Sequence, residues 1–127
     1  MTPIETAAAS VALLAVGLTA LSLWVSRLRL RYRVSFGDGG HRDLQAAVRA
    51  HGNTLEQGLL FGMLALAYAA LQAAQAPWLA ACAVTFGMAR LMYVGGLFGR
   101  WLALRQVAHL LTVAMQLVLV GLIGRAL

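Results

Sequence analysis

The chain has 127 residues, of which 61% are hydrophobic and only 11% are charged. A water-soluble domain usually carries about 25% charged residues, so the composition excludes an ordinary soluble domain and indicates an integral membrane protein. Ten basic residues, all of them arginine, stand against four acids and give a net charge of +6. In a soluble protein that balance would indicate nucleic-acid binding. Here the arginines gather at the ends of apolar segments, where membrane topology and anionic lipid headgroups explain them, and we expect no nucleic-acid partner.

The first predicted helix covers residues 4–26. At a rise of about 1.5 Å per residue it is about 34 Å long, which is enough to cross the apolar core of a bilayer. It is too long for the core of a signal peptide, and positive charge follows it rather than precedes it, so we expect a retained helix. Residues 27–43 are rich in arginine and contain the sequence GDGG. We predict a basic loop with a plain turn at these glycines, with a phosphate-binding loop as the alternative.

Three further apolar segments complete a predicted bundle. We expect a second helix over residues 42–75, which is longer than the bilayer requires, so its first turns should project into water. Pro77 is well placed to begin a third helix over residues 77–97. The sequence GGLFGR separates it from a fourth helix over residues 102–123. The sequence therefore predicts an all-α integral membrane protein with one domain, residues 1–127, built as a four-helix bundle.

The arginines are distributed unevenly among the predicted loops. The first loop holds five of them, and the region after the third helix adds Arg100 and Arg105. The second loop has no charge, and the two ends of the chain share only Arg125. Because basic residues tend to remain on the cytoplasmic side, we predict that the first and third loops are cytoplasmic and that both termini lie outside.

Polar residues recur along one face of the predicted second helix, beginning at its cytoplasmic end. At about 100° per residue they fall within a narrow arc. They are Arg42, Gln45, Arg49, Asn53 and Glu56. The fourth helix repeats the pattern with Arg105, His109, Thr112 and Gln116, and the third contributes Arg90 and Tyr93. Because ionisable groups in a membrane normally face a bundle interior or a wet cavity, we expect these faces to meet at one depth.

This spacing allows a structural interpretation and a ligand-binding one. In the first, Arg49 and Glu56 pair with each other or across helices and lock the bundle. They lie about two turns apart with Asn53 between them, so they cannot pair closely without a bridging group. In the second, the surplus arginines hold the carboxylates of a small anion while Glu56 holds its ammonium. Glutathione has that charge pattern and also a thiol, although amino-acid-like or nucleotide-like anions would fit as well.

The remaining residues with reactive or metal-binding side chains do not indicate a second functional site. Cys82 lies alone in an apolar run and is expected to be buried and inert. His41, His51 and His109 do not have the spacing of metal ligands, so we predict no metal site. His109 is expected to form a hydrogen bond between helices. A small proton-coupled exporter would need a carboxylate in the middle of the first helix, which has only Glu5, at its outer end.

The stretch RAHGNTLE, residues 49–56, resembles the Arg-x-x-x-Asn-x-x-Glu signature of the MAPEG family, the membrane-associated proteins in eicosanoid and glutathione metabolism. The preceding GDGGHRDLQAAV is similar to the corresponding segment of bacterial members, and the resemblance extends over nearly the whole chain. It implies a homotrimer of four-helix protomers in a bacterial inner membrane. It also implies glutathione bound at subunit interfaces, near the cytoplasmic side, between the second helix of one subunit and the fourth helix of its neighbour.

The resemblance further implies a membrane-bound, glutathione-dependent transferase or peroxidase that acts on lipophilic small molecules with an electrophilic centre. The residues that would bind glutathione are Arg27, Arg49, Asn53, Glu56 and Tyr93. Arg105 matches the arginine that stabilises the glutathione thiolate, and Arg100 is the alternative for that role. A free thiol titrates at about pH 8.5 and the thiolate is the nucleophile, so a nearby guanidinium would favour the reactive form.

Two departures from the family pattern leave a second function open. Several active members carry a tyrosine where this chain has Leu97, and some carry an aromatic residue where it has Gln57. The alternative is a non-catalytic membrane protein that binds glutathione or a lipid. The sequence does not distinguish glutathione from another low-molecular-weight thiol.

Overall fold

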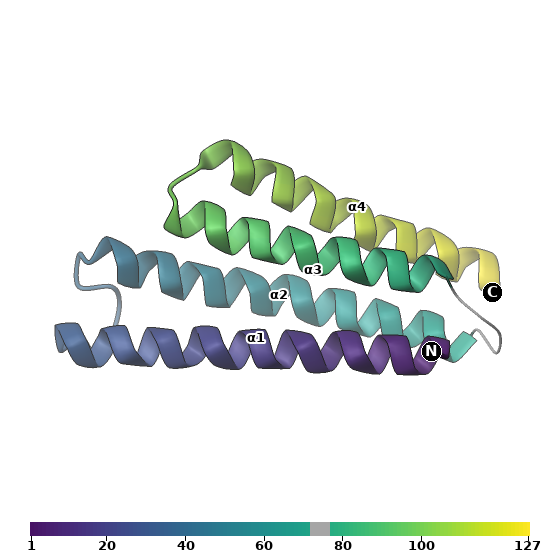
Figure 1. The fold of residues 1–127 in the computed structure, drawn as a ribbon, viewed down its shortest axis with the longest axis horizontal. Coiled ribbons are helices and arrows are strands. Elements are labelled where there is room, and N and C mark those ends of the chain that lie inside the picture. The colour runs from purple at the N-terminus through teal and green to yellow at the C-terminus, as the bar shows by residue number, and fades with distance from the viewer. Residues whose placement is uncertain (72–76) are drawn as a thin grey trace.

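The protein, seen in a computed structural model that describes residues 1–71 and 77–127, folds into helices that run alternately up and down in chain order (Figure 1). The described helices are α1 (Pro3–Tyr32), α2 (Arg42–Leu71), α3 (Pro77–Phe98) and α4 (Leu102–Ala126). Each of these four is long and apolar enough to cross a membrane. The predicted all-α class and the four membrane-spanning helices are therefore confirmed. The two termini lie at the same end of the bundle (Figure 1).

The first helix is longer than predicted. Residues 27–32, which were expected in the basic loop, continue α1, and Arg33 ends it in the left-handed conformation with φ of 54°. The arginines of this segment alternate with good helix formers, and the first glycine comes only at Gly37, so nothing breaks the helix at residue 26. The predicted end of the second helix, at residue 75, lies outside the described residues.

The connection between α1 and α2 contains the predicted turn. Its three glycines all have positive φ, which is the conformation that residues with a side chain rarely adopt. The Asp38 carboxylate accepts a hydrogen bond from the Gly40 backbone N–H at 2.9 Å, and the Asp38 carbonyl accepts one from the His41 N–H at 2.9 Å. The glycines thus serve the geometry of the turn itself.

The turn is held against the helices that it joins. Tyr32, the last residue of α1, stacks on His41 with ring centroids 3.8 Å apart, and its hydroxyl donates a hydrogen bond to the Asp43 carboxylate at the start of α2. A small apolar cluster of Leu28, Leu44 and Ala47 lies beside it. These contacts fix the start of α2, the segment in which the polar stripe begins.

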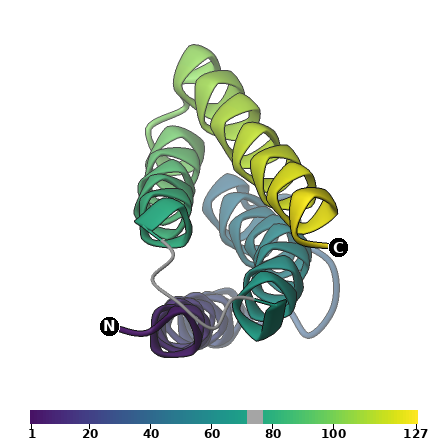
Figure 2. The same ribbon diagram turned by 90° about the vertical axis from the view of Figure 1, so that its right-hand side faces the viewer.

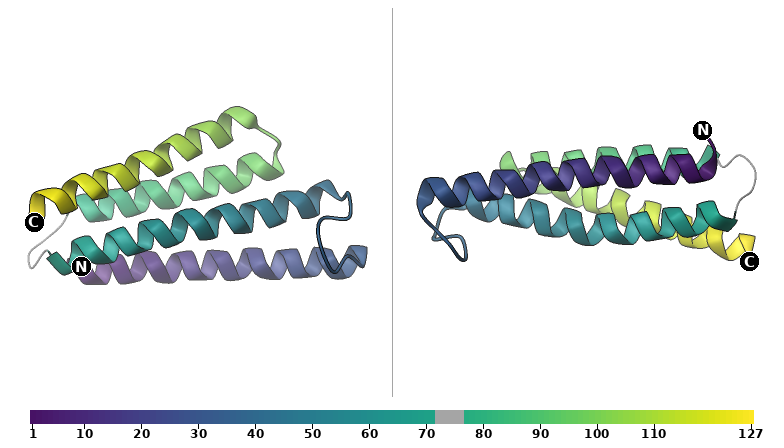
Figure 3. Two further views of the ribbon diagram at one scale, coloured as in Figure 1. Left: turned by 180° about the vertical axis from the view of Figure 1, so that it is seen from behind. Right: turned by 90° about the horizontal axis from the view of Figure 1, so that it is seen from below.

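The α2 helix is the central element of the bundle. It contacts each of the other three helices, whereas α1 packs mainly on α2 and α3 mainly on α4. The view from the end with the termini and the views from behind and below show this arrangement (Figures 2 and 3). Small residues allow the close approach of α1, since a Cβ on Gly62 would meet the Val11 side chain at 3.3 Å. A central α2 can therefore present residues to pockets on both of its sides.

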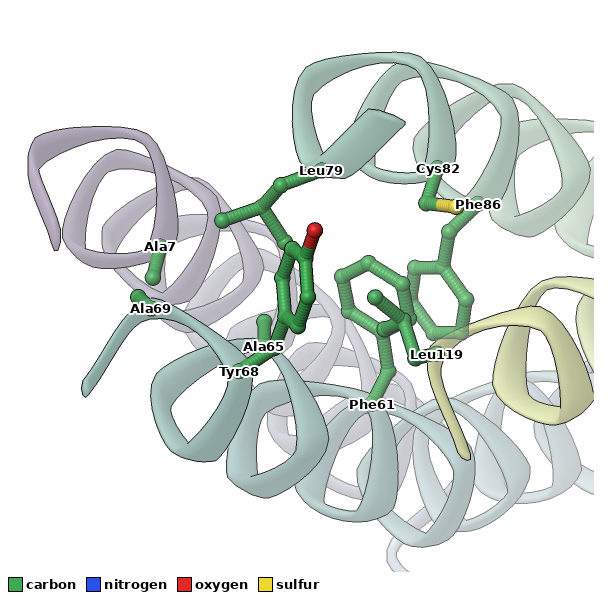
Figure 4. Packing of buried hydrophobic residues seen from close by; sticks show 9 residues of the cluster. All are labelled: Ala7, Phe61, Ala65, Tyr68, Ala69, Leu79, Cys82, Phe86 and Leu119. Atoms are coloured by element: carbon green, nitrogen blue, oxygen red, sulfur yellow. The ribbon is translucent and has the colours of Figure 1, made fainter. Parts of the chain in front are cut away.

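The main apolar core occupies the half of the bundle that holds the termini. At its centre Phe61 of α2 stacks on Phe86 of α3, with ring centroids 4.0 Å apart (Figure 4). Cys82 belongs to this cluster and is only 3% exposed, as the sequence predicted. The whole cluster is Ala7, Phe61, Ala65, Tyr68, Ala69, Leu79, Cys82, Phe86 and Leu119. The polar stripe occupies the opposite half.

Large apolar side chains also cover the outside of the chain. Leu13, Leu59, Leu91 and Leu110 are each at least 63% exposed and come from the four different helices. In water such a surface would cost free energy, whereas lipid or neighbouring subunits would cover it at little cost.

Candidate functional site

Two adjoining pockets lie along the polar half of α2. The first, which we call the α1–α2 pocket, has a volume of about 670 Å³. It is lined by Arg29, Phe36, Gly37, Asp38, Gln45, Val48, Arg49, Gly52, Asn53 and Glu56. The second, the α2–α4 pocket, has a volume of about 520 Å³. It is lined by Arg42, Asp43, Gln45, Ala46, Arg49, Leu97, Phe98, Arg100 and Arg105.

The α1–α2 pocket brings together three of the residues singled out from the sequence. Arg49, Asn53 and Glu56 line it from one face of α2, as their spacing predicts. No salt bridge forms anywhere among residues 1–71 and 77–127, so Arg49 and Glu56 do not lock the bundle within one chain. The pocket holds both arginine and carboxylate side chains, a lining suited to a ligand with charges of both signs.

The α2–α4 pocket brings Arg49 and Arg105 together from different helices. Among the described residues that line it are four arginines and a single carboxylate, that of Asp43. That carboxylate already accepts hydrogen bonds from the Tyr32 hydroxyl and from the Leu44 backbone N–H. The surplus of guanidinium groups makes this pocket attractive to a small anion.

Arg105 is held by the tight joint between α3 and α4. The Trp101 backbone N–H donates to the Gly96 carbonyl at 2.9 Å, which folds the chain back at the end of α3. A Cβ on Gly96 would lie 2.8 Å from the Arg105 Cγ and 3.2 Å from its backbone nitrogen. The absence of a side chain at Gly96 therefore sets the position of Arg105. The Arg105 Nε is buried and has no hydrogen-bond partner in the described part of the chain.

Arg100, the alternative to Arg105, lines the same pocket but is exposed. It lies in the short connection between α3 and α4 and has a positive φ of 59°. An exposed guanidinium is well hydrated and interacts more weakly with an anion than a partly buried one. Of the two arginines, Arg105 is therefore the better placed to hold an anion in this pocket.

Three expected residues lie outside both pockets. Arg27 is exposed, with its guanidinium 5.7 Å from the centroid of the Trp24 ring, and Arg29 lines the α1–α2 pocket instead. Tyr93 is buried, at 7% exposure, and lines neither pocket. His109, which we expected to form a hydrogen bond between helices, is exposed and makes no side-chain hydrogen bond with the described residues. The predicted hydrogen bond is therefore not formed within the described part of one chain.

The structure gives specific contacts to a residue that the sequence placed only on a polar face. Arg90 of α3 is only 4% exposed and donates one hydrogen bond to the Asn53 side-chain oxygen, at 2.8 Å, and another to the Thr112 hydroxyl. Its guanidinium also lies 5.6 Å from the Phe86 ring and 5.0 Å from the Tyr93 ring. An arginine inside an apolar helix indicates that it has polar partners in the bundle. The sequence did not identify these partners, because they come from two other helices.

Gln57, one of the two departures from the family pattern, also joins two helices. The Gln116 side-chain amide of α4 donates a hydrogen bond to the Gln57 side-chain oxygen at 3.0 Å. Together with the Arg90 contacts, this bond ties α2, α3 and α4 together beside the two pockets. The pockets therefore lie against a polar interior rather than a purely apolar one.

Comparison with known proteins supports one family for this arrangement. Two curated relatives, each named "Inner membrane protein YecN", come from Escherichia coli strains K12 and O6:H1. Each is 34% identical over 76 residues, which are 60% of this chain and 57% of the relative, so the match spans less than two thirds of their length. The sequence pattern that defines the MAPEG family matches residues 7–125 and thus runs through all four helices. The chain belongs to the MAPEG family.

Proposed function

We propose that the protein is a membrane-bound, glutathione-dependent transferase or peroxidase that acts on lipophilic electrophiles. Membership of the MAPEG family suggests a glutathione-related function in a membrane. The observation that carries the proposal is the meeting of Arg49 and Arg105 at a pocket with four arginines and one carboxylate that is already engaged. Such a site favours a small anion that carries a thiol and can bind as its thiolate.

The two pockets would bind different parts of glutathione, the peptide backbone in the α1–α2 pocket and the thiol in the α2–α4 pocket. In the α1–α2 pocket, Arg49 would bind a carboxylate of the peptide and Glu56 its ammonium, with the Asn53 amide between them. Arg27 lines neither pocket of its own chain, so it would reach glutathione only from a neighbouring subunit. A homotrimer with glutathione at its subunit interfaces, which we propose from family membership, would provide that neighbour. Tyr93 would not touch glutathione and would act indirectly, through its ring contact with the Arg90 guanidinium.

Arg105 would activate the thiol. Making a glutathione thiol mostly ionised at neutral pH requires about 2.7 kcal/mol of differential stabilisation of the thiolate. A partly buried guanidinium in the lining of the α2–α4 pocket can supply a charge-assisted hydrogen bond to the sulfur. The thiolate sulfur would then form a bond with the electrophilic carbon, and the leaving group would depart with its electron pair.

A membrane location suits this chemistry. Lipophilic electrophiles dissolve in the bilayer and would reach the site along the exposed apolar surface of the helices. By analogy with the relatives named as inner membrane proteins, we place the chain in a bacterial inner membrane. The first and third loops would face the cytoplasm, because they carry most of the arginines. Both pockets would then open on the side where glutathione is the main thiol.

Turnover of glutathione with a chromogenic aryl halide tests the proposal. We expect the purified protein to form the conjugate, and Arg105→Ala to lower kcat by about a hundredfold, as removal of one preorganised donor does. Arg125→Ala is the matched control, since this exposed arginine near the end of α4 lies in neither pocket. If the unmodified protein forms no conjugate, or if the Arg105 variant forms it equally fast, the proposed enzymatic function is wrong.

One observation keeps a non-catalytic binding protein as the second candidate. Leu97 lines the α2–α4 pocket where several active family members have a tyrosine, so that position supplies no hydroxyl for the reaction. A binding protein would be stabilised against heat by glutathione without turning it over. Loss of that stabilisation in Glu56→Gln, together with the absence of conjugation, would establish this second function in place of the first.

A further inference from the structure

We infer that Arg90 is a positioning residue that fixes the Asn53 amide so that its NH2 group faces the ligand as a hydrogen-bond donor. The inference rests on the proposed function, because it concerns how the same site selects its ligand. It adds that the group of the ligand beside Asn53 must be an acceptor, such as a carboxylate or an amide carbonyl, and not an ammonium.

The direction of each hydrogen bond around Arg90 follows from chemistry. A guanidinium has only donors, so the atom of Asn53 at 2.8 Å must be the carbonyl oxygen of its amide. The Thr112 hydroxyl accepts from the same guanidinium and therefore directs its own hydrogen to the Ala108 carbonyl, 2.9 Å away. Every donor and acceptor in this chain of contacts thus has a single possible direction.

The Asn53 amide is consequently locked in one orientation. Its oxygen is occupied by Arg90, and its NH2 group makes no hydrogen bond with the residues that the structure describes. Asn53 is half-buried and lines the α1–α2 pocket, so this group remains available to a ligand there. Turning the amide over would set its N–H groups against those of the guanidinium, which is repulsive and leaves buried donors without partners.

The Arg90 charge reinforces this selection. Among the described residues Arg90 forms no salt bridge, and its acceptors Asn53 and Thr112 are neutral. Two aromatic rings, those of Phe86 and Tyr93, flank the guanidinium and shield it from water. A buried cation without a counter-ion raises the potential beside it and favours an anionic or carbonyl group at Asn53.

The variant Asn53→Asp tests the inference because it should raise the thermal midpoint and lower the affinity for glutathione. A carboxylate would still accept from Arg90 and would gain an ion pair, so the thermal midpoint without ligand should rise. The same change removes the NH2 donor, so glutathione affinity, measured calorimetrically on the detergent-solubilised full chain, should fall at least about tenfold. Affinity equal to that of the unmodified protein, or higher, would overturn the inference, since a ligand with a donor at this position would bind the carboxylate better.

Thr112 provides a second variant, outside both pockets. Thr112→Val keeps the shape but removes one acceptor of Arg90, and glutathione affinity should fall about three- to tenfold. Thr112→Ser keeps the acceptor and should restore affinity to within about twofold of the unmodified protein. Both are measured well below the unfolding temperature, where a merely structural role would leave affinity unchanged. Equal affinities in the valine and serine variants would count against the positioning role.

Failure of this inference differs from failure of the proposed function. If the unmodified protein binds no glutathione, the proposed function fails. The stability of Asn53→Asp without ligand still tests the contact between Arg90 and Asn53. A higher midpoint supports the contact, and an unchanged or lower midpoint refutes it. If the unmodified protein binds glutathione and only the predicted losses are missing, the function stands and the positioning role of Arg90 is wrong.

Discussion

At the scale of single residues, the lining of the α1–α2 pocket depends on a contact between two helices, in which the Arg90 guanidinium donates a hydrogen bond to the Asn53 side-chain oxygen. The spacing in RAHGNTLE places Arg49, Asn53 and Glu56 on one side of a helix, and all three line one pocket. It could not show that the Asn53 oxygen is occupied by Arg90, because that contact depends on how α3 packs against α2. Nor could it show that His109 is exposed, since exposure on a helix depends on which faces its neighbours cover.

The stacked phenylalanines give a prediction at this scale. Phe61→Ala should lower the free energy of unfolding by about 3–5 kcal/mol, because it leaves a cavity against Phe86 in the main core. Denaturant unfolding in detergent micelles, followed by circular dichroism, measures this. Leu59→Ala is the control, since that side chain is 63% exposed and should cost less than about 1 kcal/mol. Similar losses in the two variants would contradict the assignment of the core.

At the scale of the helices, the apolar segments predicted the four helices that the described residues form, but the predicted end of the first one was wrong. The run of arginines after residue 26 predicted a loop. Alternating arginine and leucine are nevertheless compatible with a helix, and α1 continues to Tyr32. The turn at the three glycines was predicted correctly because only glycine adopts positive φ easily. The tight joint between α3 and α4 could not be predicted, since it depends on Gly96 facing the backbone of Arg105.

That joint yields a prediction for catalysis. In Gly96→Ala the new Cβ would lie 2.8 Å from the Arg105 Cγ, so the Arg105 side chain or the start of α4 must shift. Under the proposed function, kcat for conjugation should fall by about tenfold to a hundredfold, as it does when a catalytic group is misplaced by about 1 Å. Gly95→Ala is a close control, because a Cβ there would meet nothing within 4 Å. Equal activity in the two alanine variants would show that the joint does not position Arg105.

At the scale of the whole molecule, composition and one short motif were enough to identify the family. The MAPEG pattern matches residues 7–125, which confirms the resemblance drawn from RAHGNTLE and the four apolar segments. The homotrimer and the bound glutathione remain proposals, because they depend on surfaces that only neighbouring subunits or a ligand would cover. The exposed apolar residues on every helix are the physical reason to expect such a cover.

The orientation in the membrane is a prediction that chemical labelling can check. With Cys82→Ser as the background, cysteine is placed either at exposed Ser35, in the connection between α1 and α2, or at Leu127. A membrane-impermeant thiol reagent added to intact spheroplasts should label the Leu127→Cys chain and should reach Ser35→Cys only after lysis. Labelling in the opposite order would invert the predicted topology and place the arginine-rich pockets away from cytoplasmic glutathione.

The central claim is that the arginines of α2 and α4 hold glutathione as its thiolate. The most direct measurement is the ultraviolet absorbance of the thiolate when glutathione is mixed with the full-length protein at neutral pH. We predict that the thiolate band appears with the unmodified protein and with Arg125→Ala, and that it is lost or greatly reduced in Arg105→Ala. A band that is absent from the unmodified protein, or unchanged by the Arg105 substitution, would contradict the account.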